Sequence, residues 1–278
     1  MKAVARILTG CLFLLFVGPS ANAAEAENAF RAAVKLQRAG KLKEAVAGYD
    51  RAIKADPKGA EAYVGRGSAL AKMGLHERAL KDYDDALRLD PNLADVYYLR
   101  GNAHNELNRH AEAVKNYDEA LRRHPKFAEA YFNRGVAFYR LGQWEKSLHD
   151  FNQAQELNPK DPAIYAQRGL TQRRLGNHEP AVADYSEAIK LDPKNAEIYN
   201  NRANAYSLLG KYDEALKDYD QAVKLDSKNA RIYANRGAIK LRQRKTDEAR
   251  KDFKTAMELD PTLKAKLEPL MALDAPQP

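Results

Sequence analysis

A period of 34 residues organises most of this chain and limits what it can fold into. Proline marks the period at Pro57, Pro91, Pro125, Pro159, Pro193 and Pro261, and Ser227 stands at the one vacant place. When this proline is numbered position 32, the copies cover residues 26–59, 60–93, 94–127, 128–161, 162–195, 196–229 and 230–263. A fixed period of this length is typical of repeat proteins, in which each copy is one supersecondary unit that packs on its neighbours.

Four positions of each copy alternate between small and large side chains. Position 8 is glycine or alanine in every copy, position 27 is always alanine, and position 20 is alanine in all copies but one, where it is Ser147. Position 24 is always tyrosine or phenylalanine. Small side chains let two helix backbones approach closely, and an aromatic ring fills the space beside them. These positions therefore predict the core of a packed helix pair.

Two further positions predict where the helices end. Position 15 is glycine in five copies, Asn108 in the third and Arg244 in the last. Glycine and asparagine tolerate the left-handed conformation that ends many helices, so this position predicts the turn between the two helices of a copy. The proline at position 32 ends the second helix. Because Arg244 has a Cβ, we expect the turn of the last copy to be loosened.

The order of small-8, small-20, aromatic-24, Ala-27 and Pro-32 resembles the tetratricopeptide repeat family over seven copies, or 238 residues. The resemblance implies an all-α fold, a right-handed superhelical solenoid of helix-turn-helix repeats. The first helix of each copy (helix A) would line a concave face, with the second (helix B) outside. Departures are Ala29 at position 4, Ser227 and Arg244. We assign residues 24–263 to the solenoid and 264–278 to a C-terminal cap and tail, with a short helix over 264–273.

Residues 1–23 have the order of a cleavable signal peptide. Lys2 and Arg6 precede the apolar run 7–17, and a small-residue triplet ends at Ala23. The run has about half of the roughly 20 apolar residues that a membrane-spanning helix needs. We therefore expect cleavage after Ala23, a periplasmic or secreted protein, and no stable membrane insertion after cleavage. The single cysteine, Cys11, lies within this segment, so the remaining chain has no thiol.

Catalytic and metal-binding patterns are missing from the sequence. The six histidines fall at unrelated repeat positions, with none four residues apart, and no nucleophile elbow or phosphate-binding glycine loop occurs. We expect no enzyme activity, no metal and no cofactor. The net charge is +8, but basic and acidic residues alternate as on solvated helix faces, so nucleic acid is not expected as a partner.

Arginine occupies position 7 in six copies, at Arg66, Arg100, Arg134, Arg168, Arg202 and Arg236. A row of cations could bind a ligand. However, position 23 of the same copies is aspartate or asparagine, and the first copy lacks both, with Ala32 and Gly48. A partly buried arginine needs a carboxylate partner, so we interpret the row as pairs between helices A and B within the scaffold.

Helical spacing places positions 2, 5, 6, 9, 12 and 13 on the face of helix A that points away from helix B. Amides and aromatic rings prevail there from the third copy onward, and Arg242 ends the row. Amides bind a peptide backbone whatever its sequence, and aromatic rings add contact area. The candidate peptide-binding residues are Tyr98, Asn102, Asn105, Phe132, Asn133, Tyr139, Arg140, Gln167, Arg173, Arg174, Asn200, Asn201, Asn204 and Asn235.

These observations predict an exported adaptor or scaffold for protein–protein interaction, which binds an extended peptide or partner segment in its concave groove. Arg140, Arg173 and Arg174 are expected to gather on one inner wall and to favour an acidic segment. The main alternative is a structural repeat protein that self-associates. An enzyme or a carbohydrate-binding protein is a third interpretation.

Overall fold

The computed structural model describes residues 21–272, and this part of the chain contains helices and turns but no strand. The A helices are α2 (Ala21–Arg38), α4 (Ala60–Lys72), α6 (Ala94–Glu106), α8 (Ala128–Arg140), α10 (Pro162–Arg174), α12 (Ala196–Leu208) and α14 (Ala230–Arg242). The B helices are α3 (Leu42–Ala55), α5 (His76–Leu89), α7 (His110–Arg123), α9 (Trp144–Leu157), α11 (His178–Leu191), α13 (Tyr212–Leu225) and α15 (Thr246–Leu259). The predicted all-α arrangement of helix-turn-helix repeats is confirmed.

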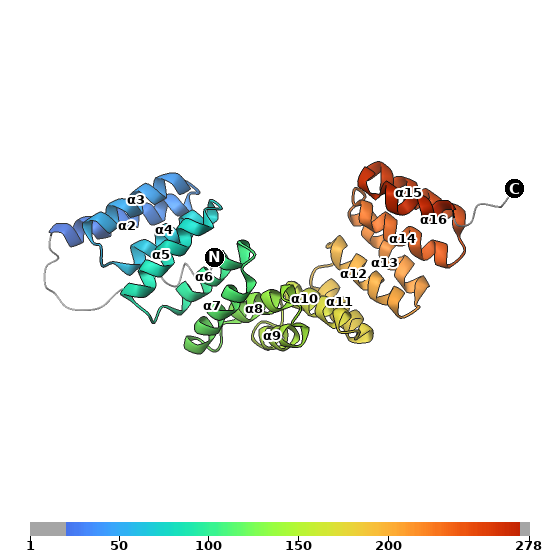
Figure 1. Cartoon of the computed structure of the whole chain (residues 1–278), viewed down its shortest axis with the longest axis horizontal. Coiled ribbons are helices and arrows are strands. Elements are labelled where there is room, and N and C mark those ends of the chain that lie inside the picture. Colours follow the sequence, from blue (N-terminus) through green and yellow to red (C-terminus); the bar gives the residue numbers. More distant parts are fainter. Residues whose placement is uncertain (1–20, 273–278) are drawn as a thin grey trace. The chain divides into compact units, whose positions relative to one another are not determined.

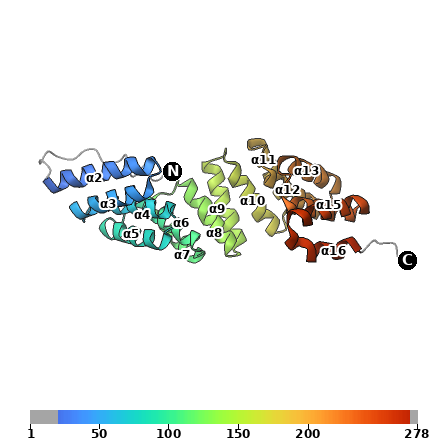
Figure 2. The same cartoon turned by 90° about the horizontal axis from the view of Figure 1, so that it is seen from above.

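The chain divides into two compact units, Met1–Gln143 and Trp144–Pro278. Of the described helices, the first unit holds α2 to α8 and the second α9 to α15, with a 3-10 turn at Pro261–Leu263 and α16 (Lys264–Ala272) after them (Figure 1). Within each unit every helix packs on its neighbours in the chain, as α2 and α3 do side by side (Figure 2), and successive A helices also touch.

The predicted core positions pack as small against large. Tyr83 on α5 is fully buried against Gly67 on α4. A Cβ atom at Gly67 would lie 2.8 Å from Cε1 of Tyr83, closer than van der Waals contact allows. In the first copy position 8 is Ala33, and the glycine stands on helix B instead. A Cβ atom at this glycine, Gly48, would lie 2.8 Å from the Cβ atom of Ala33.

The turn between helices A and B is regular in the last copy as well. Arg244 adopts a φ of 60° and Asn108 one of 58°, in the left-handed region that the glycines at this position also occupy. The Arg244 N–H donates to the Leu241 carbonyl at 2.9 Å, as in the other turns. The Lys245 N–H donates to the Lys240 carbonyl, also at 2.9 Å. The expected loosening is therefore wrong, because the turn is held by backbone hydrogen bonds that a side chain does not block.

An aspartate side chain shapes several of the turns that follow the B helices. Asp260 Oδ1 accepts the Thr262 hydroxyl at 2.6 Å and the Thr262 N–H at 3.0 Å, and these two contacts lower the pKa of Asp260. Asp226 does the same for the Lys228 N–H, at 3.2 Å. This turn needs no proline between the two residues, which explains why Ser227 replaces proline there without loss of the turn.

The two ends of the predicted solenoid lie near the ends of the described chain, residues 21 and 272. At the C-terminal end α16 packs on α15 through Leu267, which is 3% exposed, so a capping helix is present. The predicted signal peptide lies outside the described residues up to residue 20, and its cleavage point after Ala23 falls in the first turn of α2. None of the helices in 21–272 combines the length and apolar character that a membrane span requires.

Candidate peptide-binding surface

The arginine at position 7 joins helices A and B of its own copy. Arg66 donates from Nε and Nη2 to the two oxygens of Asp82, at 3.0 and 2.7 Å. The same pairing joins Arg100 to Asn116, Arg168 to Asp184, Arg202 to Asp218 and Arg236 to Asp252. The scaffold interpretation of the row is confirmed for these five copies. Arg134 and Asp150 belong to different units, so their pairing stays a prediction.

Each of these arginines has a second partner, which the sequence interpretation missed. Arg66 Nη1 donates to Asp50 at 2.6 Å, on the B helix of the preceding copy. The equivalent pairs are Arg100–Asp84, Arg134–Asp118, Arg168–Asn152, Arg202–Ser186 and Arg236–Asp220. The sequence at position 25 could have indicated these second partners. The first copy has Asp50 there although it lacks an arginine at position 7, and Asp50 pairs with the arginine of the second copy. The last copy, which has no further arginine to pair with, has Lys254 there.

The guanidinium groups thus form hydrogen bonds with two B helices of the scaffold. The hydrogen bonds that Arg66 donates to Asp82 raise the pKa of Arg66. Burial raises the pKa of Asp82, although the nearby guanidinium opposes that rise. The Arg66 Cζ atom also lies 5.6 Å from the ring centroid of Tyr63 at position 4, within the range of a cation–π contact. These arginines connect consecutive repeats and leave ligand binding to other positions.

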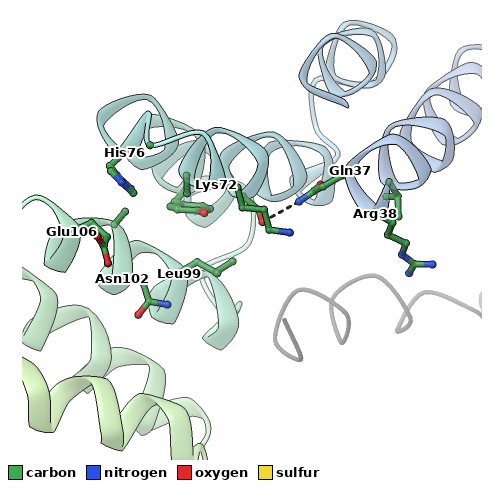
Figure 3. Close-up of a pocket in the computed structure, with 13 residues that line it drawn as sticks. Gln37, Arg38, Lys72, His76, Leu99, Asn102 and Glu106 are labelled. Carbon is green, nitrogen blue, oxygen red and sulfur yellow. Dashed lines mark hydrogen bonds between the residues drawn. The ribbon is translucent and has the colours of Figure 1, made fainter. Parts of the chain in front are cut away.

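The A helices of the first unit line a cavity of about 750 Å³. Its walls come from α2, α4 and α6, with His76 and Tyr83 contributed by α5 (Figure 3). The lining residues of the A helices are Val34, Gln37, Arg38, Ser68, Ala71, Lys72, Leu99, Asn102, Ala103 and Glu106. Most of them occupy positions 9, 12 and 13, the predicted face, but the sequence interpretation had named only Asn102 among them.

Three of the predicted residues form one hydrogen-bonded network between α6 and α8. Asn133 Nδ2 donates to the Tyr98 hydroxyl at 3.0 Å and to Asn102 Oδ1 at 2.9 Å. The Tyr117 hydroxyl also donates to Asn102 Oδ1, at 2.8 Å. Asn105 Oδ1 lies 2.7 Å from Nδ1 of His110. These amides thus join neighbouring helices and keep only part of their hydrogen-bonding capacity for a ligand.

The remaining residues predicted in the first unit, Phe132, Tyr139 and Arg140, lie on α8, where Arg140 is exposed. Arg173 and Arg174 lie on α10 of the second unit. Because Arg140 belongs to the other unit, the expected gathering of these three cations stays a prediction.

In the second unit the predicted residues come from three successive A helices. They lie on α10 (Gln167, Arg173, Arg174), α12 (Asn200, Asn201, Asn204) and α14 (Asn235). Asn235 Nδ2 donates to Asn200 Oδ1 at 3.1 Å, which joins α14 to α12. Asn204 Oδ1 accepts the Tyr219 hydroxyl at 2.7 Å. Here too the amides connect neighbouring copies.

Two cations on the A helices of the second unit act on Tyr219. Burial raises the pKa of Tyr219, and the positive charges of Arg173 and Arg242 act against that rise. Arg173 Nε is buried and has no hydrogen-bond partner among residues 21–272. Neither arginine forms an ion pair with a residue that the structure describes. The second unit thus presents positive charge on the predicted face.

Among residues 21–272, no group of histidine, cysteine and acidic side chains is arranged to hold a metal ion.

Comparisons with known proteins identify the fold and the family. Residues 20–268 match the family described as the C-terminal domain of cilia and flagella-associated protein 70, a tetratricopeptide repeat domain. No curated protein matches the sequence significantly.

Solved structures with the same fold include three tetratricopeptide repeat proteins. The C-terminal part of a tetratricopeptide repeat protein from Cytophaga hutchinsonii has a TM-score of 0.71 and 17% identity, covering 86% of this chain and 98% of its own. A tetratricopeptide repeat protein from Parabacteroides merdae has a TM-score of 0.66 and 23% identity, covering 89% and 98%. YrrB, described as having an unusual peptide-binding site, has a TM-score of 0.58 and 26% identity, covering 64% and 92%. The chain therefore belongs to the tetratricopeptide repeat family represented by the C-terminal domain of cilia and flagella-associated protein 70.

Proposed function

We propose that this protein is an exported scaffold that binds an extended peptide or partner segment on the face of its A helices. A scaffold for protein–protein interaction is what the tetratricopeptide repeat fold supports. The observation that carries the peptide-binding proposal is the cavity of about 750 Å³ formed by α2, α4 and α6. Its size falls within the roughly 300–1,000 Å³ of typical ligand sites.

The chemistry of this face suits a peptide backbone. Amide side chains such as Asn102, Asn133 and Asn204 offer both donors and acceptors, and each keeps part of that capacity after its contacts within the scaffold. YrrB, with which this chain shares its fold, is described as a peptide-binding repeat protein. An extended segment can add its own donors and acceptors to such a surface.

The second unit favours an acidic segment. Arg173 and Arg242 lie near Tyr219 without a carboxylate partner among the described residues. Positive charges placed together repel each other, and an acidic ligand removes that repulsion. Because such charges act at a distance, they should chiefly raise the rate at which an acidic partner associates.

Charge reversal tests the binding face. A partner is first identified in the native host by crosslinking. The double variant Arg173→Glu and Arg242→Glu should bind that partner with a slower association rate, and the rate should no longer depend on salt concentration. A matched control reverses Lys217 and Lys224 to glutamate, which are exposed on helix B α13. Full capture by the first variant and loss by the control would place binding on the B helices and refute the proposal. A mass that rises with protein concentration, measured by light scattering, would favour self-association instead.

Export rests on residues 1–23 and has its own test. Mass spectrometry of the protein from its native host should give an N-terminus at Ala24. Cleavage there would leave the buried residues of α2, such as Ala33 and Gln37, in place. An intact Met1 would refute export through this segment.

A further inference from the structure

The Tyr83 hydroxyl is buried without a hydrogen-bond partner among the described residues. Three other tyrosines at position 24, namely Tyr49, Tyr117 and Tyr219, have one. The Tyr49 hydroxyl donates to Gln37 Oε1 at 2.6 Å, and the Tyr219 hydroxyl donates to Asn204 Oδ1 at 2.7 Å. A buried donor without an acceptor destabilises the folded protein, so an unpaired hydroxyl in a native core calls for a specific reason.

The residue at position 9 explains why Tyr83 differs from Tyr117 and Tyr219. In the third and sixth copies this position is Asn102 or Asn204, and its amide oxygen accepts the tyrosine hydroxyl. In the second copy it is Ser68, which is shorter and instead accepts from Gln37 Nε2 at 3.2 Å. The acceptor for Tyr83 is therefore missing because a smaller side chain stands in its place, and the space that it would fill belongs to the cavity.

Tyr83 lines that cavity together with His76, which precedes it by seven residues on α5. His76 Nδ1 is also buried and has no partner within residues 21–272. The opposing walls are largely apolar, with Val34, Ala71 and Leu99 among them. A group that enters this space would meet apolar side chains and two polar atoms that need partners.

Charges of opposite sign line the cavity. Arg38 on α2 and Glu106 on α6 are exposed on opposite sides of it, and Lys72 on α4 is exposed between them (Figure 3). None of the three forms an ion pair with another described residue. A bound segment with carboxylates toward α2 and α4 would be attracted there and repelled by Glu106, which gives the site a preferred direction.

We infer that this cavity is an anchor pocket for one apolar side chain of an acidic partner segment. The Tyr83 hydroxyl donates to a backbone carbonyl of the segment, and Arg38 and Lys72 bind carboxylates next to the anchor. This inference rests on the proposed function, since it names the chemistry of a segment that the A helices would bind.

Two substitutions test the role of the hydroxyl. Tyr83→Phe removes only the hydroxyl, and Ser68→Asn supplies the internal acceptor that Asn204 gives to Tyr219. Both should keep or raise the melting temperature, because each removes an unpaired buried group, and both should weaken peptide binding by about 3–10-fold. The control Tyr219→Phe breaks an existing hydrogen bond, so it should lower the melting temperature and leave this pocket unchanged.

The probes are synthetic hexapeptides, acetylated and amidated, with two aspartates before a central leucine. In one matched peptide serine replaces leucine, and in another lysines replace the aspartates. Binding to the purified protein is followed by NMR titration. The aspartate–leucine peptide should bind at least about 10-fold more tightly than either matched peptide.

The outcomes separate the two proposals. Equal binding of all three peptides, with no change in Tyr83→Phe or Ser68→Asn, would overturn the anchor pocket and leave peptide binding by the A helices intact. A lower melting temperature for Tyr83→Phe with unchanged binding would show that the hydroxyl is satisfied within the fold, which also overturns the inference. If none of the peptides binds and partner capture in the charge-reversal experiment is unaffected, the proposed function fails as well.

Discussion

Positions 7 and 9 stand two residues apart on every A helix, but they behave differently along the chain. From the second copy onward position 7 is always arginine. In five of these six copies it donates to position 23 of its own copy and to position 25 of the preceding copy, where the partner is aspartate, asparagine or serine. Position 9 points to the opposite face and changes from copy to copy. It is Ser68, Asn102, Val136, Leu170, Asn204 and Ala238 in turn.

Position 7 thus stabilises the scaffold, whereas position 9 varies on the face proposed to bind a partner. In four copies the arginine pairs with a buried aspartate at position 23, so a neutral side chain in its place would leave that carboxylate without this counterion. Position 9 faces a surface where several side chains fit, and the consequence of each change is local. In the second copy Ser68 stands at this position, and the Tyr83 hydroxyl, which lines the cavity, has no partner among the described residues.

The largest expected effect comes from removing one of the arginines that connect the repeats. Arg202→Ala leaves Asp218, whose side chain is 9% exposed, as a buried carboxylate without a counterion. We expect the free energy of unfolding in urea to fall by about 3 kcal/mol. The control Arg242→Ala removes an exposed cation of the binding face and should change it by less than about 0.5 kcal/mol. Equal losses would erase the distinction between the two faces.

A smaller change in the free energy of unfolding is expected at position 15. Glycine, asparagine and arginine all adopt the same left-handed conformation at this position. Arg244 holds a φ of 60°, which costs a residue with a Cβ more than it costs glycine. Arg244→Gly should raise the free energy of unfolding by about 0.5–1 kcal/mol. The reciprocal change Gly210→Arg should lower it by about 1 kcal/mol, because Gly210 has a φ of 72°. A loss of stability in Arg244→Gly would mean that the arginine side chain itself supports the turn.

The smallest effect concerns the chemistry of position 23. Asn116 already stands there in the third copy and accepts from Arg100 Nε at 2.6 Å. Asp82→Asn should therefore change the free energy of unfolding by less than about 1 kcal/mol at pH 7. A loss as large as that expected for Arg202→Ala would show that the pair requires a carboxylate.

The same variant gives a pH dependence of defined sign. Burial raises the pKa of Asp82 in the folded state, so ionisation of this group opposes folding as the pH rises between the unfolded and folded pKa values. The asparagine has no such dependence. The stability of Asp82→Asn relative to the wild type should thus increase from about pH 4 to about pH 7, measured by urea unfolding at each pH. The opposite trend would mean that Arg66 outweighs the cost of burial.

The candidate binding face was predicted only in part. The spacing of positions 9, 12 and 13 identified the side of α2, α4 and α6 that lines the cavity, and Asn102 is among the lining residues. The cavity residues of the first two copies were not predicted, since Val34, Ser68 and Ala71 are ordinary apolar or small residues. A cavity depends on the volume that several side chains leave empty together, and the type of one residue does not indicate it.

The 34-residue pattern by itself determined the helices, their turns, the small-against-aromatic core and the pairing of position 7 with position 23. These features depend on residues within one copy, where helical geometry fixes which positions meet. Tertiary structure decided the second partner of each arginine, the amide network of Tyr98, Asn102 and Asn133, and the unpaired hydroxyl of Tyr83. Those depend on distances between side chains of different helices, and a difference in side-chain length as small as serine against asparagine is enough to make or lose a hydrogen bond.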